Sequence, residues 1–371
     1  MNSKVGTANL PLHTGSAPRW LFQRMVRLSR EVAAIMVDEY GSQGFLQRLS
    51  DPFWFQAFGC VLGFDWHSSG LTTTTCGALK QGLFENGNEL GIYVAGGKGN
   101  TSRRTPQEIE SFGPQLATSP DALIYASRMA AKIDSAAVQD GYQIYHHVMV
   151  FDRQGHWAVI QQGMNPGNRM ARRYHWLGEA VTDFCCEPHS AVCGDARDET
   201  LNMVAAESGG ARVASTEVAC LKPDEVMREV RRIEALELPQ RHMVQRSDVS
   251  DRYLSRVLIS TYERQPEDYE QLLGIQGVGP ATVRALSLVG ELLYGAAPSF
   301  RDPARFSFAH GGKDGTPYPV DKVNYDRTIH VLHTALTRAA VGQRDRIDAL
   351  RRLAHFEREI RQESPAQAPD G

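Results

Sequence analysis

The sequence lacks the features that mark secreted and membrane proteins. Its six cysteines include no C-x-x-C pair. It shows neither a signal peptide nor a long apolar run, so we expect neither a disulfide framework nor a membrane span. The formal net charge is only −3 at pH 7 and excludes no class of partner by itself. These absences lead us to expect a soluble, cytoplasmic, prokaryotic protein without a membrane partner.

Acidic residues are missing from three stretches of the chain. Residues 1–30, 91–107 and 154–178 contain no Asp or Glu, while the first stretch carries five basic residues. The small net charge of the whole chain therefore conceals locally basic segments. A polyanion would bind to the basic surface that such segments form. The composition is thus compatible with a polyanionic partner.

The remaining composition is that of an ordinary globular protein, with 42% hydrophobic and 22% charged residues. The length suggests two or three domains. From the patterns below we predict an α+β fold with a mixed α/β domain over residues 1–180 and a linker region over 181–222. An all-helical domain is predicted over 223–363, followed by a disordered tail over 364–371.

Helix signals dominate the beginning of the chain. Ser16-Ala17-Pro18 and Asp51-Pro52 are typical helix starts, and Gly41 can end the first helix. The second helix carries Phe53-Trp54-Phe55 and Phe58 at helical spacing. We expect these aromatic residues to lie in the core.

Strand signals follow. Ile92–Ala95 reads as a short strand, and Thr105-Pro106-Gln107-Glu108 after it has the form of a capping box at a helix start. Tyr145–Phe151 and Trp157–Gln161 are apolar runs rich in residues that favour strands, separated by a turn sequence. They predict a β-hairpin.

The segment Leu272-Leu-Gly-Ile-Gln-Gly-Val-Gly-Pro-Ala-Thr282 predicts a helix-hairpin-helix over Gln271–Tyr294. Gly277 and Gly279 allow a tight turn with no side chains in front of its N–H groups, and Val278 is expected to plug the turn against its helices. The second helix begins with its positive dipole end at the turn. We therefore expect this turn to bind a nucleic-acid backbone, DNA above all. The alternative is a turn between helices that merely needs glycine.

This stretch resembles the hairpin of the helix-hairpin-helix DNA glycosylase superfamily. Val320-Asp321-Lys322-Val323, leading into Tyr325–Leu336, is similar to the later catalytic segment of that family. The resemblance implies that Asp321 stabilises positive charge on the sugar as the base leaves. The structural alternative for Asp321 is a helix N-cap or a salt bridge to Lys322 or Arg327.

Two features of that superfamily have no counterpart in the chain. The lysine nucleophile of its strand-cleaving members falls near Ala281, so a Schiff-base reaction by that route is not predicted. The cysteine pattern that holds an iron–sulfur cluster is also missing, and we expect no such cluster.

Over nearly its whole length the chain also resembles a prokaryotic family catalogued as domain of unknown function seven hundred and sixty-three. The resemblance implies no activity. The passages that carry it are Gly6-Thr-Ala-Asn-Leu-Pro-Leu12, Asp51-Pro-Phe-Trp-Phe-Gln56, Phe64-Asp-Trp-His-Ser-Ser-Gly70 and Gln161-Gln-Gly-Met-Asn165.

The loop Asp65–Gly70 places an acid, an imidazole and two hydroxyls side by side. Active sites use such sets as general bases, metal ligands or phosphate binders. We therefore take Asp65 and His67, together with Asp321, as the catalytic candidates. In the structural alternative, Asp65 and Ser68 cap turns and His67 bonds a backbone carbonyl.

The Gly-rich loop Gly96–Arg104 precedes a helix start and is basic. Its Lys98, Arg103 and Arg104 suit a phosphate, while a solvated loop is the alternative. Because Gly99 follows Lys98, the loop departs from the P-loop pattern, and ATP hydrolysis is not indicated.

Arg172 and Arg173 stand among aromatic residues in the segment 169–176. Basic and aromatic side chains together serve both backbone neutralisation and base stacking, so we expect both arginines to contact nucleic acid. A structural surface helix with an aromatic anchor is the alternative.

We recognise no complete metal-binding pattern in the sequence. The predicted hairpin supplies His146, His147 and Asp152, but Gln161 and Gln162 stand where restriction-type nucleases place an acid-x-Lys pattern. The metal is therefore left open, with Mg²⁺ or Mn²⁺ as the cofactor that a nuclease would use. The ligand spacing usual for zinc is also absent from the cysteine-rich segment, Cys185, Cys186, His189 and Cys193.

Taken together, these patterns predict a DNA-binding enzyme that processes nucleic acid, with DNA repair as the expected role. The reaction would be hydrolysis of a glycosidic or a phosphodiester bond. One alternative is a non-catalytic module that binds DNA or RNA. The other is an RNA-processing enzyme, because contacts to the backbone do not exclude RNA.

Overall fold

The computed structural model describes residues 19–64, 70–194, 199–234, 251–304 and 322–363, and the structural statements below concern these residues. The catalytic candidates Asp65, His67 and Asp321 lie outside the described residues. So do the predicted helix start Ser16–Pro18 and the predicted tail 364–371.

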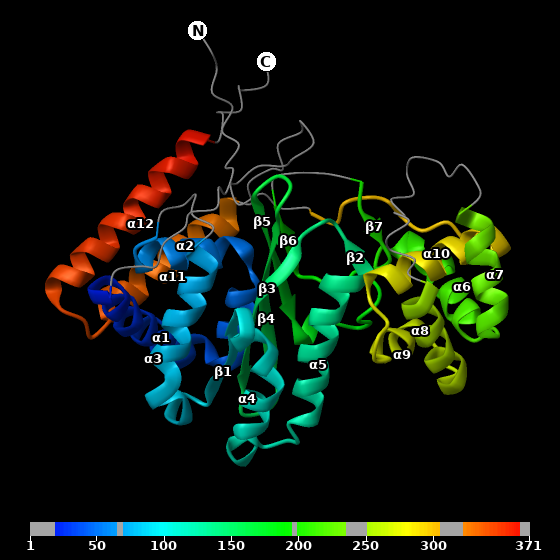
Figure 1. Ribbon diagram of the computed structural model, residues 1–371. Helices are drawn as coiled ribbons and strands as arrows, with labels where there is room; N and C mark the ends of the chain where they lie inside the picture. Colours follow the sequence, from blue (N-terminus) through cyan, green and yellow to red (C-terminus); the bar gives the residue numbers. More distant parts are fainter. Residues whose placement is uncertain (1–18, 65–69, 195–198, 235–250, 305–321, 364–371) are drawn as a thin grey trace, which may run out of the picture.

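An antiparallel five-stranded sheet runs through the middle of the molecule (Figure 1). Its strands lie in the order β1 (Ile92–Lys98), β3 (Gln143–Asp152), β4 (Trp157–Asn165), β5 (Met170–Leu177) and β6 (Ala191–Cys193). A separate two-stranded sheet pairs β2 (Val138–Gln139) with β7 (Leu201–Asn202). The predicted hairpin is confirmed, since β3 pairs with β4 from Phe151–Trp157 onward.

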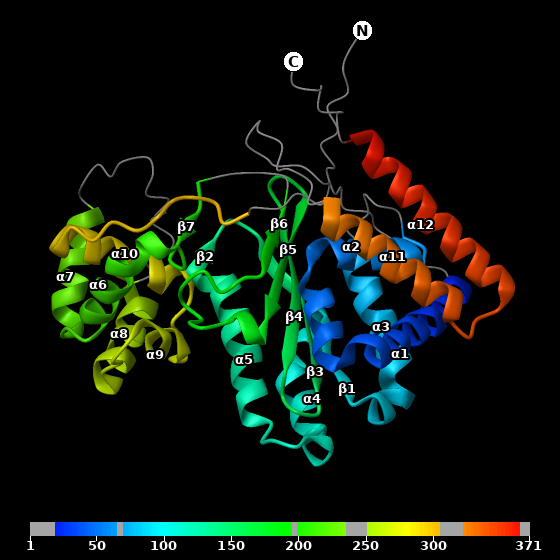
Figure 2. The same ribbon diagram turned by 180° about the vertical axis from the view of Figure 1, so that it is seen from behind.

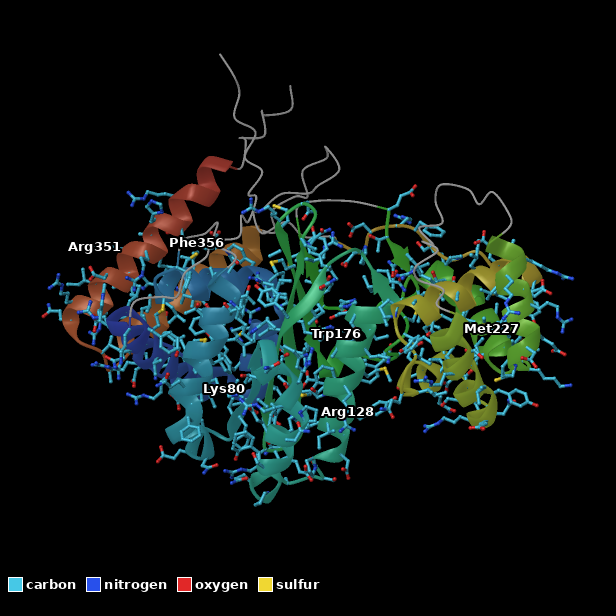
Figure 3. The ribbon with its side chains drawn as sticks, in the orientation of Figure 1. Lys80, Arg128, Trp176, Met227, Arg351 and Phe356 are labelled. Carbon is cyan, nitrogen blue, oxygen red and sulfur yellow. The ribbon has the colours of Figure 1, made fainter. Side chains whose placement is uncertain are left out.

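Helices from both ends of the chain cover one face of this sheet. They are α1 (Arg19–Ser50), α2 (Pro52–Leu62), α3 (Gly70–Leu90), α11 (Lys322–Arg338) and α12 (Gln343–Glu363). Figures 1 and 2 show α11 and α12 beside α1 and α2. Val148 and Ile160 of the sheet share a core with Leu332 and Phe356 of the last two helices. Figure 3 labels Phe356 on α12.

On the opposite side, α4 (Thr105–Ser111) and α5 (Asp121–Lys132) lie against the sheet, and the remaining helices pack beyond α5 and the π-helical turn η3 (Ile133–Ala137). They are α6 (Gly209–Ala219), α7 (Pro223–Glu234), α8 (Asp251–Arg264), α9 (Tyr269–Gly274) and α10 (Pro280–Tyr294). Short 3₁₀ helices complete the fold at η1 (Gly99–Arg104), η2 (Gly113–Gln115), η4 (Gly178–Ala180) and η5 (Ala206–Ser208). Met149 and Trp176 of the sheet share a second core with Leu272 and Leu286 of α9 and α10. The two faces together make an α+β fold.

The helices of the predicted region 223–363 belong to two packing groups. Helices α7 to α10 share the core of the α5 face, whereas α11 and α12 share the core of the α1 face. Helix α11 packs apart from α7 to α10 because the N-terminal helices cover its apolar stripe. The buried residues of this stripe are Val331, Leu332, Ala335 and Leu336.

The segment 181–222 is not the predicted linker region, because it contains β6, β7 and α6. Helix α6 buries Ala211, Ala214 and Val218 and packs closely against α10. A Cβ added at Gly290 of α10 would lie 3.0 Å from the Cβ of Ala214. Small residues on both helices permit this contact, and such residues carry only a weak apolar pattern in the sequence.

Two of the predicted helix signals are confirmed. The Asp51 carboxylate caps α2 by accepting from the N–H groups of Phe53 at 2.8 Å and Trp54 at 3.0 Å. Trp54, Phe55 and their neighbours on α2 lie in the core, as predicted. Gly41, with a φ of 70°, interrupts α1, but helical structure then resumes and continues to Ser50.

The capping box predicted at Thr105-Glu108 does not form. The Thr105 hydroxyl donates to the carbonyl of Ser102 at 2.7 Å. The Glu108 carboxylate instead accepts from the Gly96 N–H at 2.8 Å and from Lys80 Nζ at 2.6 Å. Glu108 therefore ties α4 to β1 and α3. Within the described ranges, no helix combines the length and the apolar character that crossing a membrane requires.

Candidate nucleic-acid interface

Residues 275–279 connect α9 to α10 in a tight turn. Gly277 has a φ of 94°, a conformation that side chains disfavour. A Cβ there would also lie 3.2 Å from Cγ2 of Val257. Val278 is fully buried, and its N–H donates to the carbonyl of Ile275 at 3.2 Å. The pair of helices predicted here is therefore present, with Val278 as the residue that anchors the turn.

The first turn of α10 contains backbone N–H groups without an acceptor. Gly279 is the extended residue before the helix, and its carbonyl accepts from the Val283 N–H at 2.9 Å. Pro280, which has no N–H, occupies the first helical position. Within the described residues, the N–H groups of Ala281 and Thr282 find no acceptor; Ala281 is partly exposed, whereas Thr282 is fully buried. Such groups, together with the helix dipole, make a helix N-terminus attractive to an anion.

Neighbouring elements hold the turn and engage its carbonyl oxygens. The hydroxyl of Tyr253 on α8 donates to the Gly277 carbonyl at 2.8 Å. Nε2 of Gln139 on β2 donates to the Pro280 carbonyl at 3.0 Å, and Arg284 Nη1 donates to Gln139 Oε1 at 2.6 Å. The oxygens that would repel an anion are thus already bonded within the protein.

The basic segment after β1 lies at the surface. Lys98, Arg103 and Arg104 are exposed, and the last two belong to the 3₁₀ helix η1. The Lys98 ammonium lies 5.7 Å from the ring centre of Tyr145, and Arg104 donates weakly to Thr101 at 3.4 Å. The three cations therefore stand where a polyanion can reach them.

Arg172 and Arg173 lie in β5, where each is 1% exposed. Arg172 forms ion pairs with Asp140 at 2.8 Å and Asp302 at 2.7 Å. Arg173 points to the opposite face and donates to Gln56 at 2.9 Å. The interpretation of this segment as surface is therefore wrong, because both faces of β5 are covered. In this structure neither guanidinium can contact a nucleic acid.

A buried polar cluster surrounds Asp134 of η3 and did not emerge from the sequence. Asp134 Oδ2 accepts from Gln161 at 2.5 Å and from the indole of Trp176 at 2.9 Å, while Oδ1 lies 2.5 Å from His189 Nε2. Nδ1 of His147 lies 2.9 Å from Oε1 of Gln161. The signal available in the sequence was the pair of glutamines in an otherwise apolar strand. It did not reveal the π-helical turn that brings Asp134 to them.

His146 precedes His147 on β3, and its side chain lies on the opposite face of the sheet. It is 1% exposed, and neither of its ring nitrogens has a hydrogen-bond partner. Burial lowers the pKa of its imidazole to about 3, and His147 and Lys98 act in the same direction. The ring is therefore neutral at physiological pH and closed off from solvent.

Asp152, the carboxylate of the hairpin, has a structural role. Its Oδ1 accepts from the N–H groups of Gln154 and His156 at 2.9 Å each. Its Oδ2 accepts from Ser42 at 2.7 Å and lies 2.8 Å from His156 Nδ1. These contacts close the turn between β3 and β4, so Asp152 is not available as a metal ligand.

A family model described as "Protein of unknown function (DUF763)" matches residues 6–320, well over half of the chain. The chain belongs to this family. No curated protein and no solved structure matches the chain. The resemblance to this family is thereby confirmed, whereas the resemblance to the helix-hairpin-helix DNA glycosylases stays a prediction.

The DUF763 match takes in both candidate contact regions, namely the basic segment after β1 and the turn between α9 and α10. It also spans Asp65 and His67. It ends just before Asp321 and α11. The description of the DUF763 family names no activity.

Proposed function

We propose that this DUF763 protein binds DNA through the turn between α9 and α10. The observation that carries the proposal is the pairing of the unbonded N–H group of Ala281, a partly exposed residue, with inward-bonded carbonyls at Gly277 and Pro280. A phosphate at this place would accept from this N–H group and meet the positive end of α10. Each charge-assisted hydrogen bond contributes on the order of 1.5–3 kcal/mol, so the turn alone gives a modest grip.

Lys98, Arg103 and Arg104 supply further affinity in this proposal. Exposed cations bind DNA mainly because neutralising its phosphates releases counterions. Contacts of both kinds go to the backbone, so binding would depend strongly on salt and little on base sequence.

The proposed reaction is hydrolysis of a glycosidic or a phosphodiester bond, in a role in DNA repair. Asp65 and His67 offer a carboxylate and an imidazole for general acid–base work. Asp321 follows the pattern of the helix-hairpin-helix DNA glycosylases in sequence, which supports a role in stabilising positive charge on the sugar. Mg²⁺ or Mn²⁺ would be needed for phosphodiester cleavage and not for base removal.

Substitution in the turn tests the binding site. Gly277→Ala places a Cβ at a positive φ and close to Val257, so the backbone of the turn must shift. We expect its affinity for duplex DNA in a fluorescence anisotropy titration to fall by about tenfold or more, equivalent to roughly 1.4 kcal/mol. Gly274→Ala is the matched control, since a Cβ at Gly274, in the last turn of α9, meets nothing within 4 Å. Equal affinity of the two variants would remove the turn from the interface.

A denaturing gel tests the reaction. Labelled single-stranded, duplex, uracil-containing, oxidised and abasic DNA, and RNA, are incubated with Mg²⁺, Mn²⁺ or EDTA, with and without hot alkali. Cleavage that requires metal establishes a nuclease, whereas product that appears only after alkali and persists in EDTA establishes a glycosylase. In either case Asp65→Asn, His67→Ala and Asp321→Asn show which candidates take part. Binding without product establishes a non-catalytic module. A clear preference for RNA over DNA would identify RNA as the substrate.

A further inference from the structure

A thiol and two carboxylates from distant parts of the chain meet beside α9. Asp183 and Cys185 belong to the segment between η4 and β6, and Glu270 lies in the first turn of α9. One carboxylate oxygen of each acid and the Cys185 sulfur all lie within 4.8 Å of one another. Ligand atoms at about 2.0–2.3 Å from one ion are at most about 4.6 Å apart, so small side-chain movements suffice to close this group around a metal.

The thiol at the centre of the group is buried and has no partner. Cys185 is 4% exposed, forms no disulfide, and makes no hydrogen bond through its sulfur within the described residues. The hydroxyl of Tyr269, which interacts electrostatically with Cys185, is also buried without a hydrogen-bond partner. Buried hydroxyls are normally satisfied, so the unpartnered Tyr269 hydroxyl marks a polar group left open beside the thiol.

The two carboxylates are oriented but not neutralised. The Cys185 N–H donates to Asp183 Oδ1 at 2.6 Å, and the Tyr125 hydroxyl donates to Glu270 Oε1. Each acid thus keeps its second oxygen for a ligand. In the described part of the chain neither acid forms an ion pair.

The guanidinium of Arg212 lies near the thiol but hydrogen-bonds to backbone carbonyls. Arg212 acts electrostatically on Cys185. Its Nη1, however, donates to the carbonyls of Met203 at 2.7 Å and Ala205 at 2.9 Å. Arg212 therefore acts on the thiol electrostatically while its Nη1 is bonded to the backbone.

We propose that Asp183, Cys185 and Glu270 bind one divalent transition-metal ion, with Zn²⁺ as the best match. A thiolate is a soft ligand that selects Zn²⁺ over Mg²⁺ or Ca²⁺, and carboxylate oxygens complete many zinc sites. On binding, the S–H bond of Cys185 breaks, its sulfur bonds the metal, and the proton passes to solvent. Asp183 is exposed, so water can fill the fourth position.

Such an ion would fasten α9, the first helix of the pair, to the segment that leads into β6. Protein-bound ions of this kind stabilise the folded state because the ligands are brought together only there. The site is independent of DNA binding and is tested without it.

Cobalt titration of the metal-free, full-length protein tests the proposal. Co²⁺ replaces Zn²⁺ in such sites, and its bond to a thiolate gives an intense near-ultraviolet absorption band. We expect this band to saturate at one equivalent and to disappear when Zn²⁺ is added. Cys185→Ala should lack the band, whereas Cys186→Ser, which changes the adjacent thiol outside the group, should keep it. Zn²⁺ should raise the Tm of wild type and Cys186→Ser only.

The variant Glu270→Gln tests a second ligand while Cys185 stays in place. It should keep the thiolate band but bind Co²⁺ about tenfold or more weakly, because one charged ligand is lost. No band in wild type, or a band that persists in Cys185→Ala, overturns the site. Unchanged Co²⁺ affinity in Glu270→Gln overturns the assignment of that ligand. Circular dichroism of each metal-free variant establishes that the fold is intact.

Discussion

His146 carries a neutral imidazole inside the sheet. Burial lowers its pKa to about 3, and burial also lowers the pKa values of His147 and His175. All three rings are excluded from water, where the charged form would be solvated. Because the unfolded chain exposes them, these histidines make the stability of the protein sensitive to acid.

The direction of this effect follows from proton counts. In the unfolded chain His146 binds a proton near pH 6.5, and in the folded chain only near pH 3. Between these values the unfolded state holds more protons, so the free energy of unfolding falls as the pH falls. His146→Leu removes the contribution of His146 and leaves those of His147 and His175. Between about pH 7 and about pH 5 we expect the variant to lose about 2 kcal/mol less stability than wild type in urea unfolding.

Met149→Leu serves as the control, because Met149 is buried on the same strand and has no titratable group. It should change stability by the same amount at both pH values. A wild-type pH dependence in His146→Leu would mean that His146 is protonated in the folded protein.

Buried polar residues were also the hardest to place from the sequence. A basic and aromatic stretch such as 169–176 fits a surface helix as well as a covered strand. Alternate residues of β5 face opposite sides, and each guanidinium finds its partners far along the chain. Arg172 meets Asp140 and Asp302, and Arg173 meets Gln56. Removing one partner of a buried ion pair such as those of Arg172 costs about 3–5 kcal/mol of folding stability. The stability of β5 therefore depends on partners supplied by other elements.

Single elements were easier to predict when their signals depend on near neighbours. Asp51 caps α2 through N–H groups two and three residues on, and Gly277 turns the chain between two adjacent helices. The capping box at Thr105 failed for the opposite reason. Its Glu108 carboxylate is taken by Lys80 and by the backbone of Gly96, neither of which belongs to α4.

The element η1 gives the proposed interface a quantitative test. Arg103 and Arg104 are exposed at its end. Each phosphate contact contributes about 0.9 to the slope of log K against log salt. Replacing both arginines by alanine should therefore lower the slope by up to about 2 and weaken binding at low salt most. Anisotropy titrations of duplex DNA at several salt concentrations measure this.

Arg351→Ala is the matched control on α12. Arg351 is also exposed, with 77% of its side chain accessible, and lies on the helix farthest from α10 (Figure 3). Its removal should leave the slope unchanged. Equal losses in the control and in the double variant would mean that DNA binds to charge in general and not to η1.

At the scale of the whole molecule, the sheet joins two cores, and the first and last described helices share one of them. The rings of Phe53 on α2 and Phe356 on α12 lie 5.5 Å apart, and Arg352 donates to the Val61 carbonyl at 2.9 Å. Contacts between residues so distant in sequence leave no local pattern. This is why the amphipathic character of α11 and α12 could be recognised but not the helices that cover them.

Because both cores include side chains of the same strands, we predict that they unfold together. Leu332→Ala on α11 and Leu286→Ala on α10 remove fully buried side chains from the two cores, and each should cost about 2–5 kcal/mol. Leu292→Ala, at a half-exposed position of α10, should cost far less. In urea unfolding, circular dichroism and hydrogen exchange of α10 and α11 peptides should report one transition, shifted as a whole by either core variant. Two transitions, with Leu332→Ala moving only one, would mean that β1, β3 and β4 do not transmit the loss of one core to the other. The N- and C-terminal helices would then form a body that folds independently of α6 to α10.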